Sequence, residues 1–178
     1  MFSTIFRRLI TCSFLAVFLF AGCKKSASGT EGVNGDAFMQ FSTDYPFGGK
    51  NEFKSNSTVG GFVTKTNTDG KTQIIITAVQ MDGSQIGTAM LTIYVPKNYS
   101  GTISGKFENG STENTEAVLA IGISNAGTIQ EDYTSVSGNY NITKLTASEI
   151  EGTFDAYCKN EAGGNNLSLS SGKFSGKF

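Results

Sequence analysis

The sequence predicts an all-β fold in one domain, either an antiparallel β-sandwich or a small β-barrel. Alternating apolar and polar residues recur in short segments over residues 37–178. Turns rich in Gly, Asn and Asp separate these segments at intervals of roughly ten to fifteen residues. No segment carries a long apolar stripe with the helical period. Short strands at such regular spacing are typical of sandwiches and barrels.

The first elements of this domain are short. Residues 37–42 are expected to form a strand or a short helix. Residues 52–54 and 59–66 flank a polar Ser-Asn-Ser segment, and this arrangement predicts a small hairpin between them.

The next hairpin has a stronger signal. Residues 71–80 and 85–95 are rich in β-branched and apolar side chains. Asp82-Gly83 lies between them, and this dipeptide favours a tight turn because both residues tolerate positive φ. Pro96 ends the second strand, since proline cannot donate to the ladder. Further strands are expected at residues 101–107, 116–123, 138–145, 150–159 and 166–178.

Strand parity predicts which side chains of the last two strands face the core. Alternation places one set of residues on the apolar side: Ile150, Gly152, Phe154, Ala156 and Cys158. Cys158 is therefore expected to be a buried, inert thiol.

Leu167 and Leu169 have the opposite parity to Phe174 and Phe178. A β-bulge near residues 170–172 would bring both pairs to the core. Gly-x-aromatic units recur along the chain and are expected to mark where strands begin or bend: Gly105-Phe107, Gly138-Tyr140, Gly152-Phe154 and Gly172-Phe174.

The N-terminus has the layout of a secretory signal. Arg7 and Arg8 precede the apolar run 9–21, which is shorter than the about 20 residues of a transmembrane helix. Residues 1–22 are expected to be removed by cleavage between Gly22 and Cys23. Residues 23–36 are rich in Gly and Ser and are expected to form a flexible tether to a single β-rich domain at 37–178.

The sequence Phe20-Ala21-Gly22-Cys23 resembles the lipobox of bacterial lipoproteins. The resemblance implies that Cys23 receives fatty acyl chains and anchors the protein to a membrane. Two or more acyl chains hold a protein stably, whereas one holds it only marginally.

The C-terminal third is similar to the ends of small Bacteroidota outer-membrane lipoproteins of unknown function. The similarity lies in the strand 137–144, the Gly-Thr-Phe strand 151–156 and the Gly-x-Phe of the last strand. It implies a mostly β exported domain and carries no site residues. Lipoproteins displayed outside the cell in this phylum often have acidic residues after the cysteine. Lys24-Lys25-Ser26 lacks them, which favours the periplasmic face of the outer membrane over the cell surface.

Composition excludes several kinds of chemistry. The chain contains no histidine, so neither a Ser-His-Asp triad nor a Cys-His dyad can form, and the commonest metal ligand is missing. No phosphate-binding loop occurs. The net charge is −1 and there is no long basic run, so nucleic acid is not an expected partner. No catalytic residue, metal or cofactor is expected.

The expected function is that of a lipid-anchored, non-enzymatic binding or envelope-structural module, whose ligand is an unidentified protein or glycan. Aromatic residues near strand ends are expected to pack in the core or at its rim, and any that are exposed could stack on sugars or fill a partner's pocket: Tyr45, Phe47, Tyr94, Tyr99 and Tyr133.

One alternative is a glycan hydrolase that uses two carboxylates, drawn from Glu131, Asp132, Glu151 and Asp155. A second is a lipocalin-like lipid carrier, which would need a large apolar internal cavity.

Overall fold

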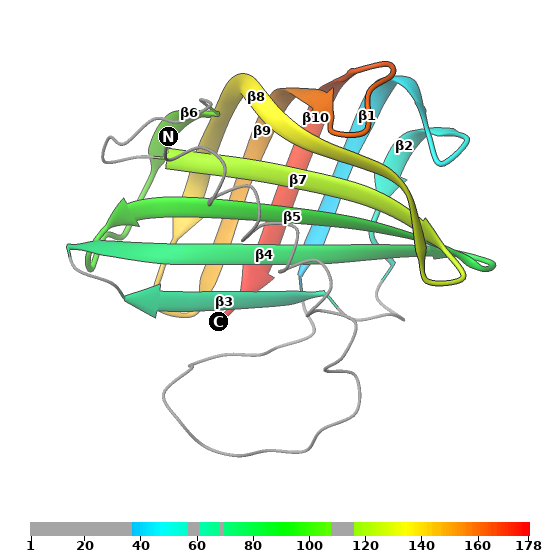
Figure 1. Cartoon of the computed structure of the whole chain (residues 1–178). Helices are drawn as coiled ribbons and strands as arrows, with labels where there is room; N and C mark the ends of the chain where they lie inside the picture. Colours follow the sequence, from blue (N-terminus) through cyan, green and yellow to red (C-terminus); the bar gives the residue numbers. More distant parts are fainter. Residues whose placement is uncertain (1–36, 57–60, 68–69, 108–115) are drawn as a thin grey trace.

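The computed structural model describes residues 37–56, 61–67, 70–107 and 116–178, and every regular element within these ranges is a β-strand (Figure 1). The all-β prediction is therefore confirmed. The predicted signal 1–22, the cleavage point at Gly22 and Cys23, and the tether 23–36 lie outside the described residues. In the part of the chain that the structure covers, no helix is long and apolar enough to cross a membrane.

The strands form one mixed sheet in the order β2-β1-β10-β9-β8-β6-β7-β5-β4-β3, with a further pairing between β8 and β7. Neighbouring strands are antiparallel except β6 and β7, which are parallel. The strands are β1 (Phe38–Phe47), β2 (Lys50–Lys54), β3 (Phe62–Asn67), β4 (Lys71–Asp82), β5 (Gln85–Pro96), β6 (Ile103–Phe107), β7 (Glu116–Asn125), β8 (Thr128–Leu145), β9 (Glu149–Asn160) and β10 (Leu167–Lys177).

The sheet folds over itself into two layers and is not closed into a barrel, so the arrangement is sandwich-like. β3, β4, β5 and β7 form the front layer in Figure 1, and β6, β9, β10, β1 and β2 run across them behind. β8 belongs to both layers. Its first part pairs with β7, and its second part pairs with β6 and β9. Strands that pass between layers in this way form the corners of crossed sandwiches.

A glycine permits β8 to change layers. The register between β8 and β9 shifts between Ser135 and Ser137, and the adjacent Gly138 has a φ of 128°. A side chain at Gly138 would collide with the carbonyl oxygen of Asp155 and would lie 2.7 Å from Cα of Ala156. Gly138 therefore marks a bend, as the sequence predicts.

The core lies between the two layers and is filled by the inward-facing side chains of both. The five residues predicted for the inner side of β9 are all buried. Aromatic rings fill much of the space: Phe41 stacks on Phe53 with 4.9 Å between ring centroids and contacts the edge of Phe154 at 5.9 Å. Each such side chain contributes about 1.5–3 kcal/mol through burial.

The Gly-x-aromatic units of β9 and β10 fit each other reciprocally. Gly152 lies opposite Phe174, and Phe154 lies opposite Gly172. A Cβ atom on Gly172 would stand 2.7 Å from Cδ1 of Phe154, and a Cβ atom on Gly152 would collide with the Phe174 ring. Each phenylalanine thus lies over the glycine of the neighbouring strand, an arrangement that covers the glycine backbone and fixes strand register.

The same arrangement recurs between β6 and β8, where Gly105 lies opposite Tyr140 and a Cβ atom on Gly105 would collide with the tyrosine ring. Because they lack a side chain, Gly105, Gly152 and Gly172 leave room for an aromatic ring of the neighbouring strand. Gly105 and Gly152 lie inside their strands, so the prediction that they mark strand starts or bends is wrong for these two, whereas Gly172 lies at a register shift of β10.

The predicted bulge in the last strand is confirmed. The register of β10 against β9 shifts between Leu169 and Gly172, and both Leu169 and Phe174 are buried. Ser171, within the shift, has a positive φ of 54°. The extra residue reverses the parity of the strand, so that apolar side chains on both sides of it reach one core.

The positive φ of Ser171 gives a testable prediction. Ser171→Gly is expected to raise the free energy of unfolding by about 0.5–1 kcal/mol, because a non-glycine residue in the left-handed region costs about 1–2 kcal/mol. The neighbouring Ser170→Gly is the control and is expected to lower it by about 0.5–1 kcal/mol. Urea unfolding of both variants checks this, and equal effects at the two positions would contradict it.

The predicted hairpin between residues 52–54 and 59–66 is wrong. β2 pairs with β1 through a turn at Gly48 and Gly49, which have φ values of 60° and 81°, and β3 pairs with β4. β2 and β3 end up at opposite ends of the sheet order. Alternation gives a strand its faces but does not select its neighbour.

Candidate binding site

An open groove of about 690 Å³ lies on the outer face of the rear layer, across β6, β8, β9 and β10. It is called the rear groove below. Its outward-facing side chains are all polar or charged, while the alternate residues of the same strands, such as Tyr140 and Phe154, are buried beneath it. The outward-facing set is Ser104, Lys106, Asn139, Asn141, Thr153, Asp155, Ser171 and Lys173.

Strand register arranges these side chains in two rows that cross the strands. The first row is formed by directly opposed residues: Ser104 faces Asn141, Asn141 faces Thr153, and Thr153 faces Lys173. Within it, the Ser104 hydroxyl donates to Oδ1 of Asn141 at 2.8 Å. Opposed residues on one face of antiparallel strands lie close enough to act together on one ligand.

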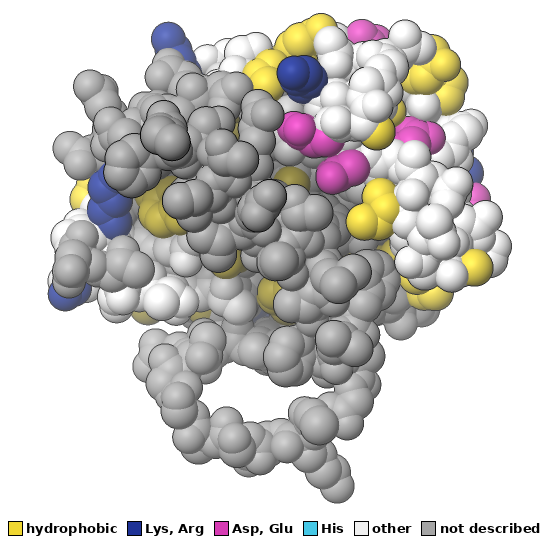
Figure 2. Space-filling view, in the orientation of Figure 1, with side chains coloured by type: hydrophobic (Ala, Val, Ile, Leu, Met, Phe, Trp, Pro, Cys, Tyr) yellow, Lys and Arg dark blue, Asp and Glu magenta, His cyan; other side chains and the backbone are white. Residues whose placement is uncertain are grey.

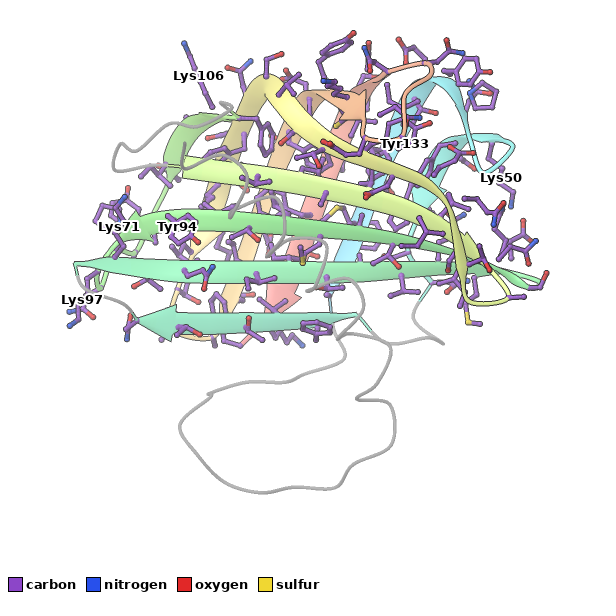
Figure 3. The ribbon with its side chains drawn as sticks, viewed as in Figure 1. Lys50, Lys71, Tyr94, Lys97, Lys106 and Tyr133 are labelled. Carbon is purple, nitrogen blue, oxygen red and sulfur yellow. The ribbon has the colours of Figure 1, made fainter. Side chains whose placement is uncertain are left out.

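The second row runs parallel to the first. Lys106 faces Asn139, and Asn139 faces Asp155. Nδ2 of Asn139 donates to Oδ2 of Asp155 at 3.3 Å, so that the amide and the carboxylate are held side by side. Lys106 extends outward from β6 at the upper left of Figure 3.

The reciprocal glycine and aromatic pairs lie directly under the rear groove. Gly105, Gly172, Tyr140 and Phe154 belong to its lining as well as to the inner face. The rings of Phe107 and Tyr140 have centroids 5.8 Å apart, and the ring of Phe107 meets Phe154 at 6.4 Å. Rigid aromatic packing beneath the strands fixes the spacing of the polar side chains above.

The rear groove carries two ammonium groups and one carboxylate. Both Lys106 and Lys173 are exposed, and neither takes part in the ion pairs found among described residues. Lys144, on the same β8 strand, differs: its Nζ lies 2.8 Å from Glu149 and 3.5 Å from Glu151, and its pKa is raised, chiefly by the hydrogen bond to Glu149.

An exposed aromatic residue lies on the same face as the rear groove. Tyr157 is 42% exposed and follows Asp155 by two residues on the outer side of β9. Nδ2 of Asn166 donates to its hydroxyl at 2.8 Å, which orients the ring. Sequence alternation placed Tyr157 on the polar side of its strand but gave no reason to select it.

The five aromatic residues selected from the sequence have different environments. Phe47 and Tyr133 are core residues, with ring centroids 5.9 Å apart. Tyr94 accepts a hydrogen bond from Gln73 on the front layer, and Tyr99 donates to the carbonyl of Thr102. Only Tyr45, 47% exposed, presents a large aromatic surface. The core role expected for these aromatic residues is confirmed for Phe47 and Tyr133, and of the five only Tyr45 is exposed enough to stack on a ligand.

The carboxylates considered for catalysis lie in two places: Glu131 and Asp132 are consecutive residues of β8, and Glu151 and Asp155 lie on the outer face of β9. Asp155 lies in the rear groove, and Glu151 pairs with Lys144. Asp132 lies in a shallow depression beside Ile129, and burial together with the charge of Glu161 raises its pKa.

Glu131 is engaged separately, since it accepts a hydrogen bond from the Tyr133 hydroxyl at 3.0 Å. Figure 2 shows acidic side chains gathered on the upper part of the face presented in Figure 1. Within the described ranges, no three Asp, Glu, Cys or His side chains form a group that could hold a metal ion.

Cys158 is fully buried, as predicted, and burial raises the pKa of its thiol to about 12. The folded-state pKa is above the ordinary value of about 9, so the unfolded chain loses this proton first as the pH rises. The contribution of the buried neutral thiol to the free energy of unfolding is complete below about pH 9. It falls by about 1.4 kcal/mol per pH unit up to about pH 12.

Cys158→Ala is expected to remove the decrease of the free energy of unfolding with pH that this thiol causes. The variant should be less stable than the wild type near pH 8, because it leaves a small cavity, and the difference should shrink towards pH 10.5. Urea unfolding at the two pH values measures it. A difference that stays constant would contradict the burial of a neutral thiol. Burial also raises the pKa of Tyr133 to about 12. Tyr133 is present in both proteins, so its effect on stability at alkaline pH cancels in the comparison.

The fold and this site together define a two-layer β protein with an open polar groove on its outer face. Comparison with protein-family models, with curated proteins and with solved structures finds no match for the chain.

Proposed function

We propose that this protein is a lipid-anchored binding module of the bacterial envelope, and that the rear groove is its ligand-binding surface. The observation that carries the proposal is the groove itself. Four adjacent strands present ordered rows of hydroxyl, amide and charged side chains over a rigid aromatic floor. Open surfaces with a few oriented polar groups on a rigid scaffold suit reversible binding.

The anchoring part of the proposal rests on the lipobox-like Phe20-Ala21-Gly22-Cys23 and on the resemblance to small Bacteroidota lipoproteins. Fatty acyl chains on Cys23 would hold the domain at the outer membrane, on its periplasmic face, since Lys24-Lys25-Ser26 lacks acidic residues. The tether 23–36 would allow the domain to move relative to the membrane.

Binding is favoured over hydrolysis by the contents of the rear groove. Of the described carboxylates, Asp155 alone lines it, whereas a glycosidase uses two facing carboxylates. Binding at the surface is favoured over internal lipid carriage by the packing between the layers. Rings such as Phe41, Phe53 and Phe154 occupy that space.

The test uses the whole mature chain with Cys23→Ala, isotopically labelled for NMR. Glycan, lipid and protein fractions of the envelope are added separately, and the backbone amide shifts are followed. One fraction is expected to shift the amides of Asn139, Asn141 and Thr153 and to leave those of β4 unchanged. The double variant Asn139→Ala/Asn141→Ala is expected to abolish the response. If no fraction shifts these amides, the proposed function is wrong.

A further inference from the structure

The rear groove offers a ligand side chains but no free backbone edge. β10 pairs with β9 and β1, β9 with β10 and β8, and β6 with β8 and β7. Every strand beneath the groove therefore has a neighbour on both sides. A peptide that binds by adding a strand needs a free edge. Among the described strands, β8, β9 and β10 offer none beneath the groove, and β6 pairs with β7 through Lys106 and Phe107 at its end.

The chemistry of the rear groove also disfavours an apolar anchor. Its outward-facing side chains are serine, threonine, asparagine, aspartate and lysine, and its apolar surface belongs to the floor, which includes the largely buried rings of Tyr140 and Phe154. The polar side chains suit a ligand covered with hydroxyls, because a side-chain amide both donates and accepts hydrogen bonds. Oδ1 of Asn141 accepts a hydrogen bond from Ser104, and its NH₂ group takes no part in that bond.

The two rows determine how a ligand would lie. β6 and β10 are three strand spacings apart, which is about 14 Å at the usual distance between neighbouring strands. This length accommodates a short run of sugar rings crossing the strands. Tyr157, on the same face, supplies an exposed ring of the kind on which sugars stack.

The charged side chains of the rear groove favour acidic glycans over neutral ones. Lys106 lies on β6 and Lys173 on β10, at the two sides of the rear groove, and Asp155 between them already accepts a hydrogen bond from Asn139. Two ammonium groups outside the described ion pairs favour carboxylate groups on the ligand.

We infer that the rear groove binds an acidic glycan, with sugar rings over Asn139, Asn141 and Thr153 and carboxylates beside Lys106 and Lys173. This inference rests on the proposed function and adds the class of ligand. Exposed ion pairs contribute modestly and are screened by salt, so each lysine should account for about two- to fivefold in affinity at low ionic strength.

The experiment compares ligands of equal length on the mature Cys23→Ala chain by calorimetry and NMR. The acidic probes are hexamers of galacturonate, mannuronate and hyaluronan, the neutral probes are xylohexaose and cellohexaose, and a glutamate-rich decapeptide tests charge alone. At least one acidic hexamer is expected to bind most tightly, to shift the groove amides, and to lose affinity as salt is added.

Variants identify the residues responsible. Lys106→Gln/Lys173→Gln is expected to weaken the acidic hexamer about tenfold and to leave neutral hexamers unchanged. Lys97→Gln is the matched control, because Lys97 lies in the turn after β5 on the front layer (Figure 3), and it should change nothing. Thermal unfolding confirms that the variants fold.

Three outcomes would overturn the inference. Neutral hexamers that bind as tightly as every acidic one would remove the acidic preference. Equal binding of the decapeptide would show recognition of charge rather than sugar. Failure of all hexamers to shift the groove amides would exclude a glycan. In each case, a response of these amides to another envelope fraction would leave the proposed binding function intact.

Discussion

Gly152→Ala is expected to lower the free energy of unfolding by about 3 kcal/mol, a large effect for the addition of a single methyl group. A Cβ atom at this position would collide with the Phe174 ring and stand 2.5 Å from the carbonyl oxygen of Asn141. The ring could turn, but the carbonyl belongs to the β8–β9 ladder and could move only by breaking register. Chemical denaturation measures the loss.

Gly87→Ala is the matched control. Gly87 also faces the core from a strand interior, but its nearest neighbours would be Cδ1 of Ile123 at 3.3 Å and Cε2 of Phe53 at 3.4 Å. These are ends of side chains that can adjust, and alanine restricts the unfolded chain, so the effect should lie within about 1 kcal/mol of zero. If both substitutions cost the same, the glycine and aromatic pairing would not determine stability.

The same pairing predicts coupling between Gly152 and Phe174. Phe174→Leu alone should be destabilising because it removes part of a buried ring. Combined with Gly152→Ala, it should cost less than the sum of the two single effects, since a smaller side chain leaves room for the new methyl group. The clash with the Asn141 carbonyl remains, so the rescue should be partial.

Cys23→Ala is expected to move the protein from the membrane pellet to the soluble fraction. Burial of acyl chains contributes about 0.8 kcal/mol per CH₂ group, so removal of the acylated sulfur removes nearly all membrane affinity of the described domain. Fractionation of cells measures the distribution, and the mass of the purified wild-type protein tests for lipid on residue 23. Cys158→Ala is the matched cysteine control and should remain in the pellet.

An unprocessed signal could also keep the Cys23→Ala variant at a membrane. A second variant, in which residues 1–22 are replaced by a signal cleaved by the ordinary signal peptidase, removes this ambiguity. If it still sediments with the outer membrane, or if residue 23 of the wild type carries no lipid, anchoring through Cys23 is wrong.

Much of the strand assignment follows from the sequence. The hairpin predicted at 71–80 and 85–95 is present as β4 and β5, and Gly83 in its turn has a φ of 60°. The faces of β9 and the bulge in β10 were also predictable, because side chains alternate between the two faces of a strand and apolar residues therefore mark the inner face. β8 begins at Thr128, ten residues before the expected start at Gly138. The prediction missed this first part of the strand because it contains few apolar side chains.

The candidate site was much harder to predict. Asn139, Asn141, Thr153 and Lys173 are ordinary surface residues in sequence, and nothing local separates them from other polar positions. They become a site only because β6, β8, β9 and β10 are neighbours, which brings residues 104 and 173 to one face.

The sequence by itself determined the β class of this protein, the inner faces of the last two strands, the absence of histidine chemistry and the lipobox-like segment. These depend on composition or on residues close together in the chain. Tertiary structure alone decided which strands pair, where β8 passes between layers, and that the rings of Tyr140, Phe154 and Phe174 lie over glycines of neighbouring strands. Those choices depend on packing between distant segments, and local alternation is the same for every possible neighbour.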